Sequence, residues 1–145
     1  MRLCHRPVAE RADDAGSRSD GEGSRPDGER DGDDARVLAS RVDVADSSLA
    51  RARGLMFRRS VPADYALAFP FDGAAVRALH MLFVPFDIDA VWTVDGRVRR
   101  VERLDAWTGL ARAEADLVFE LPAGGAAAVT AGDRVELRGA GADGV

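Results

Sequence analysis

His80, Asp87 and Asp89 are the residues whose types and spacing best suit acid–base chemistry. They lie within one short stretch, HMLFVPFDID, and a histidine beside a carboxylate is the commonest pair for moving a proton. If the chain brings these side chains together, they predict a hydrolase or a metal-assisted enzyme. The elements on either side of the stretch decide whether it can.

Two apolar segments, Val76–Val84 and Ile88–Val94, are predicted to be strands that pair as a hairpin. In one register His80 faces Trp92, and Asp89 lies on the opposite face of the sheet. In the next register His80 and Asp89 share a face, but they are about 13 Å apart at about 3.3 Å per residue. A direct dyad is therefore not expected. The simpler interpretation is a strand histidine stacked on Trp92 and an aspartate that accepts hydrogen bonds from backbone amides.

Metal ligands and nucleophiles are scarce in this chain. It has two histidines, His5 and His80, and a single cysteine, Cys4, which excludes an internal disulfide or a cysteine cluster for a metal. Cys4 and His5 are neighbours on a predicted strand, so their side chains point to opposite faces. Gly124–Gly125 runs into alanines and lacks the spacing of a phosphate-binding loop. We predict no catalytic residue, no metal and no cofactor.

Trp107 is the aromatic residue that most needs a reason for its position. It lies in DAWTGLARAEA, a loop-like stretch between two predicted strands, where it can close one end of the core or line an apolar groove. Arg58, just after a predicted helix cap, offers a polar anchor for a ligand or peptide. The candidate ligand-binding residues are Met56, Arg58, His80, Asp89 and Trp107.

The segment Glu10–Asp34 differs in kind from the rest of the chain. It holds ten acidic and four basic residues, a net charge of −6 in a chain whose total is −5. It has almost no apolar side chain whose burial could offset the loss of chain entropy, so residues 10–35 are predicted to be a disordered acidic insert. The remaining residues are near neutral and rich in apolar side chains.

All 20 basic residues are arginine, which suits phosphate recognition, but they are not gathered into a strongly basic segment. Nucleic acid is therefore not predicted as a partner. No stretch approaches the roughly 20 apolar residues of a membrane span, and the first residues lack the apolar core of a secretion signal. We expect a cytoplasmic protein. The oligomeric state is left open.

The remaining residues predict a β-rich domain. Residues 1–9 are expected to form an edge strand that pairs with part of Arg36–Ala45, as a hairpin whose tip holds the insert. Asp95–Gly96 is a strong hairpin signal between Ile88–Val94 and Arg97–Leu104, and the spacing of the apolar residues in the second strand predicts a bulge near Arg99–Arg100. Other expected strands are Tyr65–Phe69, Leu117–Leu121 and Arg134–Leu137, with turns at Pro62–Asp64, Asp72–Gly73 and Ala131–Asp133.

Short helices are expected over about Ser47–Arg53, ended by a left-handed Gly54, and over Gly124–Thr130. The predicted fold class is mainly β, bordering on α+β. It is a small antiparallel β-sandwich or partly closed barrel with two short helices, which occupies residues 36–138 and is followed by a flexible tail at 139–145.

Three segments together resemble the domain of unknown function 192 family. They are ARARGLMFR (Ala50–Arg58), HMLFVPFDIDAVW (His80–Trp92), and VFELPAG followed by AGDRVEL within Val118–Leu137. The chain departs from the family at Asp87, where the family usually has proline, and in its long insert. The arginine-rich, lysine-free sequence is similar to members from salt-loving archaea.

The resemblance implies a small, mainly antiparallel β domain and brings no substrate, cofactor or catalytic residue. We therefore predict a non-catalytic domain that binds a small molecule or a protein. The alternative is a hydrolase or metal-assisted enzyme that uses His80 with Asp87 or Asp89.

Overall fold

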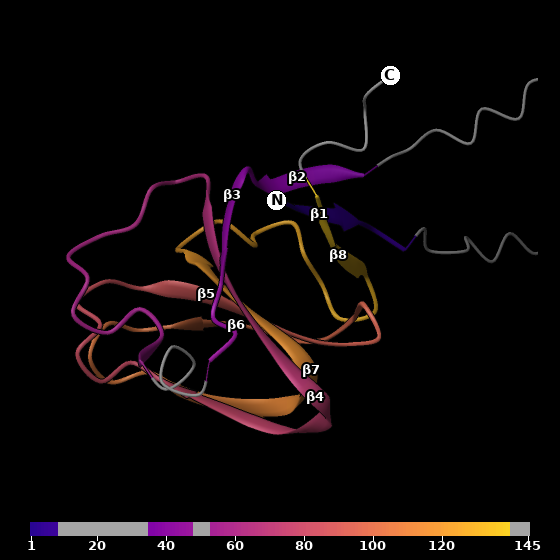
Figure 1. The fold of residues 1–145 in the computed structure, drawn as a ribbon. Helices are drawn as coiled ribbons and strands as arrows, with labels where there is room; N and C mark the ends of the chain where they lie inside the picture. Colours follow the sequence, from indigo (N-terminus) through magenta and orange to yellow (C-terminus); the bar gives the residue numbers. More distant parts are fainter. Residues whose placement is uncertain (9–34, 48–52, 140–145) are drawn as a thin grey trace, which may run out of the picture.

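The computed structural model describes residues 1–8, 35–47 and 53–139, and their strands form one eight-stranded sheet (Figure 1). The order across the sheet is β2-β1-β8-β6-β5-β7-β4-β3. Only β3 and β4 pair in parallel, so the sheet is mixed. The strands are β1 (Arg2–Arg6), β2 (Arg36–Ala39), β3 (Arg41–Val44), β4 (Tyr65–His80), β5 (Ile88–Val94), β6 (Arg97–Leu104), β7 (Leu110–Pro122) and β8 (Arg134–Arg138).

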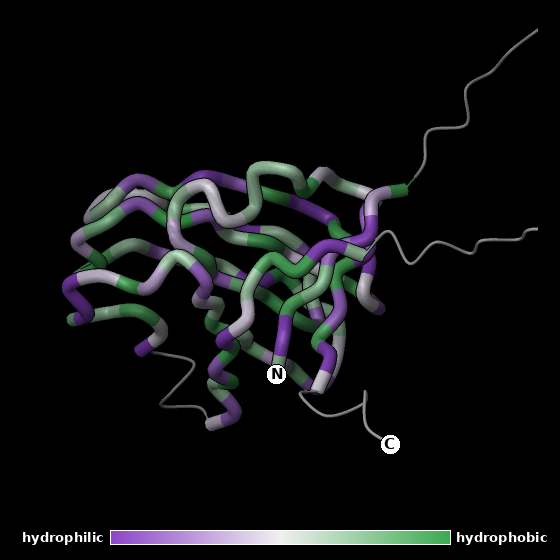
Figure 2. The backbone as a smooth tube through the Cα atoms, turned by 90° about the horizontal axis from the view of Figure 1, so that it is seen from above, coloured by the Kyte–Doolittle hydropathy of each residue, from purple (hydrophilic) through white to green (hydrophobic). Residues whose placement is uncertain are grey.

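Buried apolar side chains lie on both faces of the central strands. Figure 2 shows hydrophobic and hydrophilic residues interspersed along the chain. One face carries a cluster that we call the site-side core, which includes Leu67, Phe69 and Trp92. The other face carries a cluster that includes Leu3 and Phe119. Where Leu67 of β4, Ala90 of β5 and Glu120 of β7 lie side by side, both faces are covered, so a polar side chain at this point is buried as well.

The β5–β6 hairpin has the bounds and the turn that the sequence predicts. Asp95 and Gly96 both adopt positive φ angles, 51° and 75°, as the tight turn requires. Trp92 pairs with Arg100 and Thr93 with Val98, so Arg99 is the extra residue of a bulge. This confirms the predicted bulge.

The predicted pairing of Val76–Val84 with Ile88–Val94 is wrong, because β7 lies between β4 and β5. β4 continues through the predicted turn at Asp72–Gly73, where its register with β7 shifts. β7 starts earlier than predicted, at Leu110, so that β4 and β7 pair along most of their length. This long ladder, formed by segments distant in the sequence, replaces the local hairpin.

The fold class is mainly β, as predicted, but the described strands form one open mixed sheet and neither the predicted antiparallel sandwich nor a partly closed barrel. The strands of the described residues belong to one open sheet with β2 and β3 at its edges. The predicted helix at Gly124–Thr130 is instead a run of turns, with Gly125 N donating to Pro122 O and Val129 N to Ala126 O. The other predicted helix is Ser47–Arg53, and its residues 48–52 lie outside the described residues. No described helix is long and apolar enough to cross a membrane.

The first residues form a strand, but this strand is not at the edge of the sheet. β1 pairs with β8 on one side and with β2 on the other, so β2 takes the edge position. The predicted strand Arg36–Ala45 breaks at Ser40, where Ser40 N and Arg41 N both donate to Asp64 O. The predicted insert (10–35, except Ala35) and the tail (139–145, except Gly139) lie outside the described residues.

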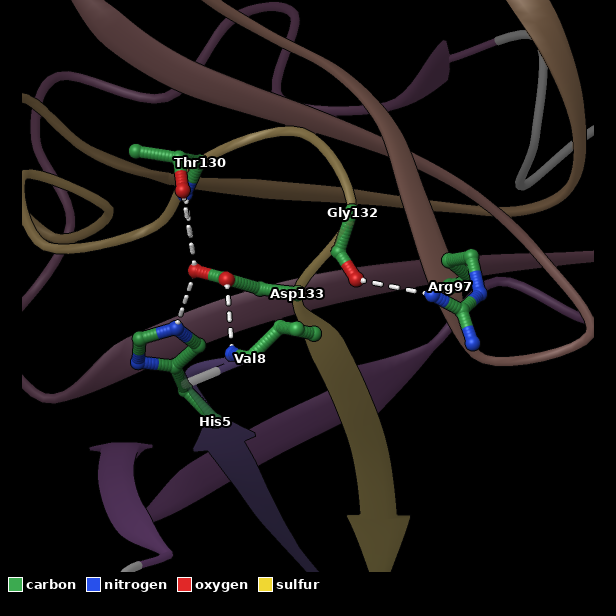
Figure 3. A network of polar contacts seen from close by, with 6 residues as sticks. All are labelled: His5, Val8, Arg97, Thr130, Gly132 and Asp133. Atoms are coloured by element: carbon green, nitrogen blue, oxygen red, sulfur yellow. Dashed lines mark hydrogen bonds and ion pairs between the residues drawn. The ribbon is translucent and has the colours of Figure 1, made fainter. Parts of the chain in front are cut away.

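A buried polar network holds β1 to the turn before β8 (Figure 3). His5 Nε2 lies 2.7 Å from Asp133 Oδ2, which also accepts from the backbone N of Thr130, and Val8 N donates to Asp133 Oδ1. Arg97 donates to Gly132 O beside them. Burial alone would raise the pKa of Asp133, but the hydrogen bonds from His5, Thr130 and Val8 together lower it.

This network predicts a loss of stability in acid. A carboxyl group with a lowered folded pKa stabilises the fold above its unfolded pKa, near 3.8, and the stabilisation disappears as pH falls through the folded value. Asp133→Asn should lower the free energy of unfolding by about 1–3 kcal/mol at pH 6, because a charged acceptor is lost. Urea denaturation between pH 2 and 6 should show this difference shrinking below pH 4. A difference that stays constant down to pH 2 would contradict the role given to Asp133.

Candidate functional site

Glu120 lies in the middle of the sheet, on the face of the site-side core. On β7 it pairs with Leu67 of β4 and with Ala90 of β5, both of which are buried. Its neighbours Phe119 and Leu121 belong to the cluster on the opposite face, so the alternation of the strand turns Glu120 toward the site-side core. The residue is only 5% exposed. The carboxyl group of Glu120 therefore occupies a buried position whose neighbours on the adjacent strands are apolar.

The segment after residue 52 passes over this carboxyl group at Gly54. Gly54 has a φ of 50°, the left-handed conformation predicted for it. A Cβ placed there would lie 3.7 Å from both carboxylate oxygens of Glu120 and 3.4 Å from Phe69 Cζ. Glycine therefore lets the backbone adopt this turn close above Glu120.

A pocket of about 150 Å³ lies between this segment and the end of β4. We call it the Glu120 pocket. Its lining residues are Arg53, Gly54, Leu55, Met56, Ala78, Leu79, His80, Val84 and Glu120. A second hollow of about 400 Å³ lies on the β3 side of the same segment and includes Asp43, Arg58 and Leu67 in its lining. Glu120 lines the first of these cavities and not the second, so the buried carboxyl group belongs to the Glu120 pocket.

The carboxyl group of Glu120 is unsatisfied within the part of the chain that the structure describes. Its Oε2 atom is buried and has no hydrogen-bond partner. Burial raises the pKa of Glu120 to about 8, against an opposing effect of the Arg58 charge. At neutral pH the side chain is mostly a neutral carboxylic acid, which can donate one hydrogen bond and accept others.

His80 contributes a second titratable side chain to the pocket. It is the last residue of β4 and is exposed. Its Nδ1 atom accepts a hydrogen bond from the backbone N of Leu82, at 3.3 Å. In the neutral ring the proton is therefore on Nε2, which is then a donor.

Three exposed aromatic residues adjoin the pocket, and their backbones are unusual. Phe57, Phe83 and Trp107 all have left-handed φ angles, between 60° and 66°. The Phe57 and Phe83 rings stack with centroids 5.1 Å apart, and Phe57 N donates to Phe83 O. Trp107 N donates to Val84 O, and Val84 lines the pocket. Such conformations cost about 1–3 kcal/mol each and tend to gather at functional sites.

Arg58 lies on the other side of the segment, next to the second hollow. Its guanidinium group is 5.2 Å from the centre of the Tyr65 ring. The Tyr65 hydroxyl donates to Asp43 Oδ2 at 3.0 Å, and burial raises the pKa of Tyr65. Arg58 therefore acts on the Glu120 pocket through its charge and is not part of the pocket lining.

Asp89 and Asp87 are occupied elsewhere. Asp89 Oδ2 accepts from the backbone N of Gly124 and of Ala126, each at 3.0 Å, and its Oδ1 accepts from Arg103 Nε. Asp87 Oδ1 accepts from Ala106 N at 2.8 Å. Neither aspartate lines the pocket that contains His80. Both hold turns in place through backbone amides, which was the simpler interpretation of Asp89.

The structure thus brings together only some of the predicted site residues. Met56 and His80 line the Glu120 pocket, and Arg58 and Trp107 are its neighbours. Asp89 is separate from it. The sequence reasoning missed Glu120, because a single acidic residue in the run VFEL is also what a strand with one solvent-facing side would carry.

Comparison with solved structures gives two similar folds, both from bacteria. A protein of unknown function from Novosphingobium aromaticivorans DSM 12444 has a TM-score of 0.63 and 24% identity, covering 71% of this chain and 77% of that one. A protein from Sinorhizobium meliloti 1021, named a "putative transcription regulator", has a TM-score of 0.59 and 26% identity, covering 66% of this chain and 79% of that one. The curated proteins give no match.

The family comparison agrees with the three segments identified above. The model of the DUF192 family, described as "Uncharacterized ACR", matches residues 30–137. The matched region includes β2 to β7, the Glu120 pocket and most of β8, and it leaves out β1. The resemblance to members from salt-loving archaea stays a prediction. The chain belongs to the DUF192 family.

Proposed function

We propose that this chain is a cytosolic, non-catalytic domain that binds a small molecule in the Glu120 pocket. One observation carries the proposal: a buried carboxyl group with an unpartnered oxygen lines a cavity large enough for a ligand. Buried polar groups are nearly always paired with protein or with water. An unpaired one at a cavity is therefore explained by a partner that the described residues do not supply.

The composition of the lining supports a small ligand. Leu55, Leu79 and Val84 give apolar contacts, while Glu120 and His80 give a few polar ones, as in most ligand sites. An engineered cavity of about 150 Å³ holds benzene, so the volume suits a molecule of roughly six heavy atoms.

Filling the pocket should abolish binding. Ala78 lines the pocket, so Ala78→Leu places a larger side chain in the ligand's space. We expect at least one of a panel of small acids, amides and amines to raise the melting temperature of the wild-type protein by a few degrees, since a ligand that binds the folded state stabilises it. The same compound should have no effect on Ala78→Leu.

A matched control is Ala74→Leu, at an exposed position of the same strand outside the pocket. This variant should respond to the compound as the wild-type protein does. If both leucine variants respond equally, the compound binds elsewhere and the proposal fails.

Acid–base catalysis is the second candidate, because His80 and Glu120 line the same cavity. It differs from the predicted pairing of His80 with Asp87 or Asp89, whose carboxylates are held by backbone amides. His80→Gln separates the two functions. Under the binding proposal it changes affinity only, whereas under the catalytic one it leaves the fold and the affinity and abolishes turnover.

A further inference from the structure

We infer that the ligand of the Glu120 pocket is a small monocarboxylate with a short aliphatic tail, held by donors from Glu120, His80 and Arg53. This inference rests on the proposed function and names the ligand class. It follows from the donor character of the polar groups, the charge around the pocket and the shape of the cavity.

The polar groups of the lining can all be donors. Arg53 has five N–H donors and no acceptor. His80 lines the pocket and uses Nδ1 to accept from Leu82 N, so in the neutral ring its other nitrogen, Nε2, carries the proton and is a donor. Glu120 in its acid form offers an O–H group. A ligand that matches this set has to bring acceptors, and a carboxylate brings two oxygens.

The charges near the pocket also favour an anion. Arg53 lines the pocket, and the Arg58 charge reaches Glu120 from the same segment. The residues that pair with Glu120 across the sheet, Leu67 and Ala90, carry no charge. The acidic Asp43 of β3 pairs with Leu67, but it accepts from the Tyr65 hydroxyl and lines the second hollow. The charged and titratable groups that line the pocket beside Glu120, Arg53 and His80, are thus basic. A cationic ligand would be repelled by them and would need Glu120 to be ionised.

A ligand carboxylate beside Glu120 favours the protonated form of the Glu120 side chain. Two carboxylates that share a site cannot both be ionised without strong repulsion, so one of them keeps a proton. Binding therefore retains the proton of Glu120, which forms a hydrogen bond to the ligand. No bond is broken and no proton is released.

The cavity accommodates such a molecule. Propionate has five heavy atoms, within the roughly six that a cavity of about 150 Å³ accepts. Its carboxylate would lie against the three donors, and its ethyl group against the aliphatic side chains of Leu55, Leu79 and Val84. Propionate is therefore the probe, with propylamine as a cationic probe of similar size.

The experiment is calorimetric titration of both probes between pH 6 and 9.5, with the wild-type protein, Glu120→Gln and Arg53→Gln. We expect propionate to bind the wild-type protein, with a Kd that rises by about tenfold per pH unit above pH 8, where Glu120 loses its proton. Glu120→Gln keeps a donor but cannot ionise, so its Kd should not show the rise above pH 8 that the wild-type protein shows. Arg53→Gln should weaken binding about tenfold at every pH.

Other outcomes contradict the inference in distinguishable ways. If propylamine binds more tightly as pH rises and Glu120→Gln abolishes its binding, the pocket is a cation site: the proposed function stands and the carboxylate inference fails. If propionate binds Ala78→Leu as well as it binds the wild-type protein, it lies outside the pocket and the inference fails. If neither probe binds and no compound of the panel distinguishes Ala78→Leu from Ala74→Leu, the proposed function fails as well.

Discussion

Glu120→Gln should stabilise the protein in alkaline solution, by up to about 5 kcal/mol. The folded-state pKa of Glu120 is about 8, against an ordinary value of 4.5. Because the folded-state pKa is raised, the unfolded chain releases this proton more readily than the folded protein does. Below pH 4.5 the side chain therefore does not lower the free energy of unfolding, and between pH 4.5 and about 8 it lowers it increasingly. The interval between the two values corresponds to about 5 kcal/mol. Glutamine is always neutral and has almost the same shape, so it does not carry this cost.

Chemical denaturation at pH 4.5, 6, 7.5 and 9 would measure the effect. The two proteins should have nearly equal stability at pH 4.5, and the variant should gain steadily until pH 8–9. Glu114→Gln is a matched control, because Glu114 is on the same strand and is exposed. Its stability should differ little from that of the wild-type protein, because substitutions at exposed positions usually have small effects. A pH-independent difference for Glu120→Gln would mean that the carboxyl group is ionised in the fold, and the pocket chemistry would have to be reconsidered.

Asp89→Ala should lower the free energy of unfolding by about 4 kcal/mol. The carboxylate of Asp89 is buried and accepts from two backbone amides of the turns after β7, Gly124 N and Ala126 N. Without it two donors lose their acceptor, each at a cost of about 1–3 kcal/mol. The variant should keep its response to pocket ligands at temperatures where it is folded, because Asp89 does not line the Glu120 pocket.

The partner of Asp89 provides the control for this prediction. Arg103 is 52% exposed, so Arg103→Ala should have a small effect compared with Asp89→Ala, although Asp89 raises the pKa of Arg103. Asp89→Asn should be intermediate, since one amide oxygen replaces two carboxylate oxygens. If Asp89→Ala were as stable as wild type but unable to bind a pocket ligand, Asp89 would be a binding residue and its structural role would be wrong.

The parts of the fold that could be predicted are those determined by neighbouring residues. The β5–β6 hairpin follows from Asp95–Gly96 and the spacing of the apolar residues around it, and its bulge from three-residue spacing in Arg97–Leu104. The pairing of β4 with β7 joins segments about 40 residues apart, and no local signal specifies it. The tempting local alternative, a hairpin across Pro85–Asp87, was therefore wrong.

The site shows the same division. His80 was proposed because histidine suits acid–base chemistry, and Trp107 because a large aromatic residue in a loop needs a reason for its position; Met56 was added as part of a groove near them. Glu120 was missed because its importance depends on what surrounds it: a glutamate in VFEL looks like a solvent-facing strand residue until β4, β5 and the segment at Gly54 cover it. The strained aromatic backbones at Phe57 and Phe83 depend in the same way on contacts between separate loops.

The first strand of the chain, β1, pairs with the last strand, β8, so the order of strands in the sheet differs from their order in the sequence. Arg2 pairs with Arg138, so the start of β1 lies beside the end of β8, and β1 lies outside the region that matches the family. The same strand neighbours would be kept in a circular permutant, in which a short loop joins β8 to β1 and new ends are opened between β1 and β2. The neighbours of β1 are thus set by strand pairing and not by its place at the start of the chain, so we expect a β1 peptide added to a protein that lacks residues 1–8 to pair with β2 and β8.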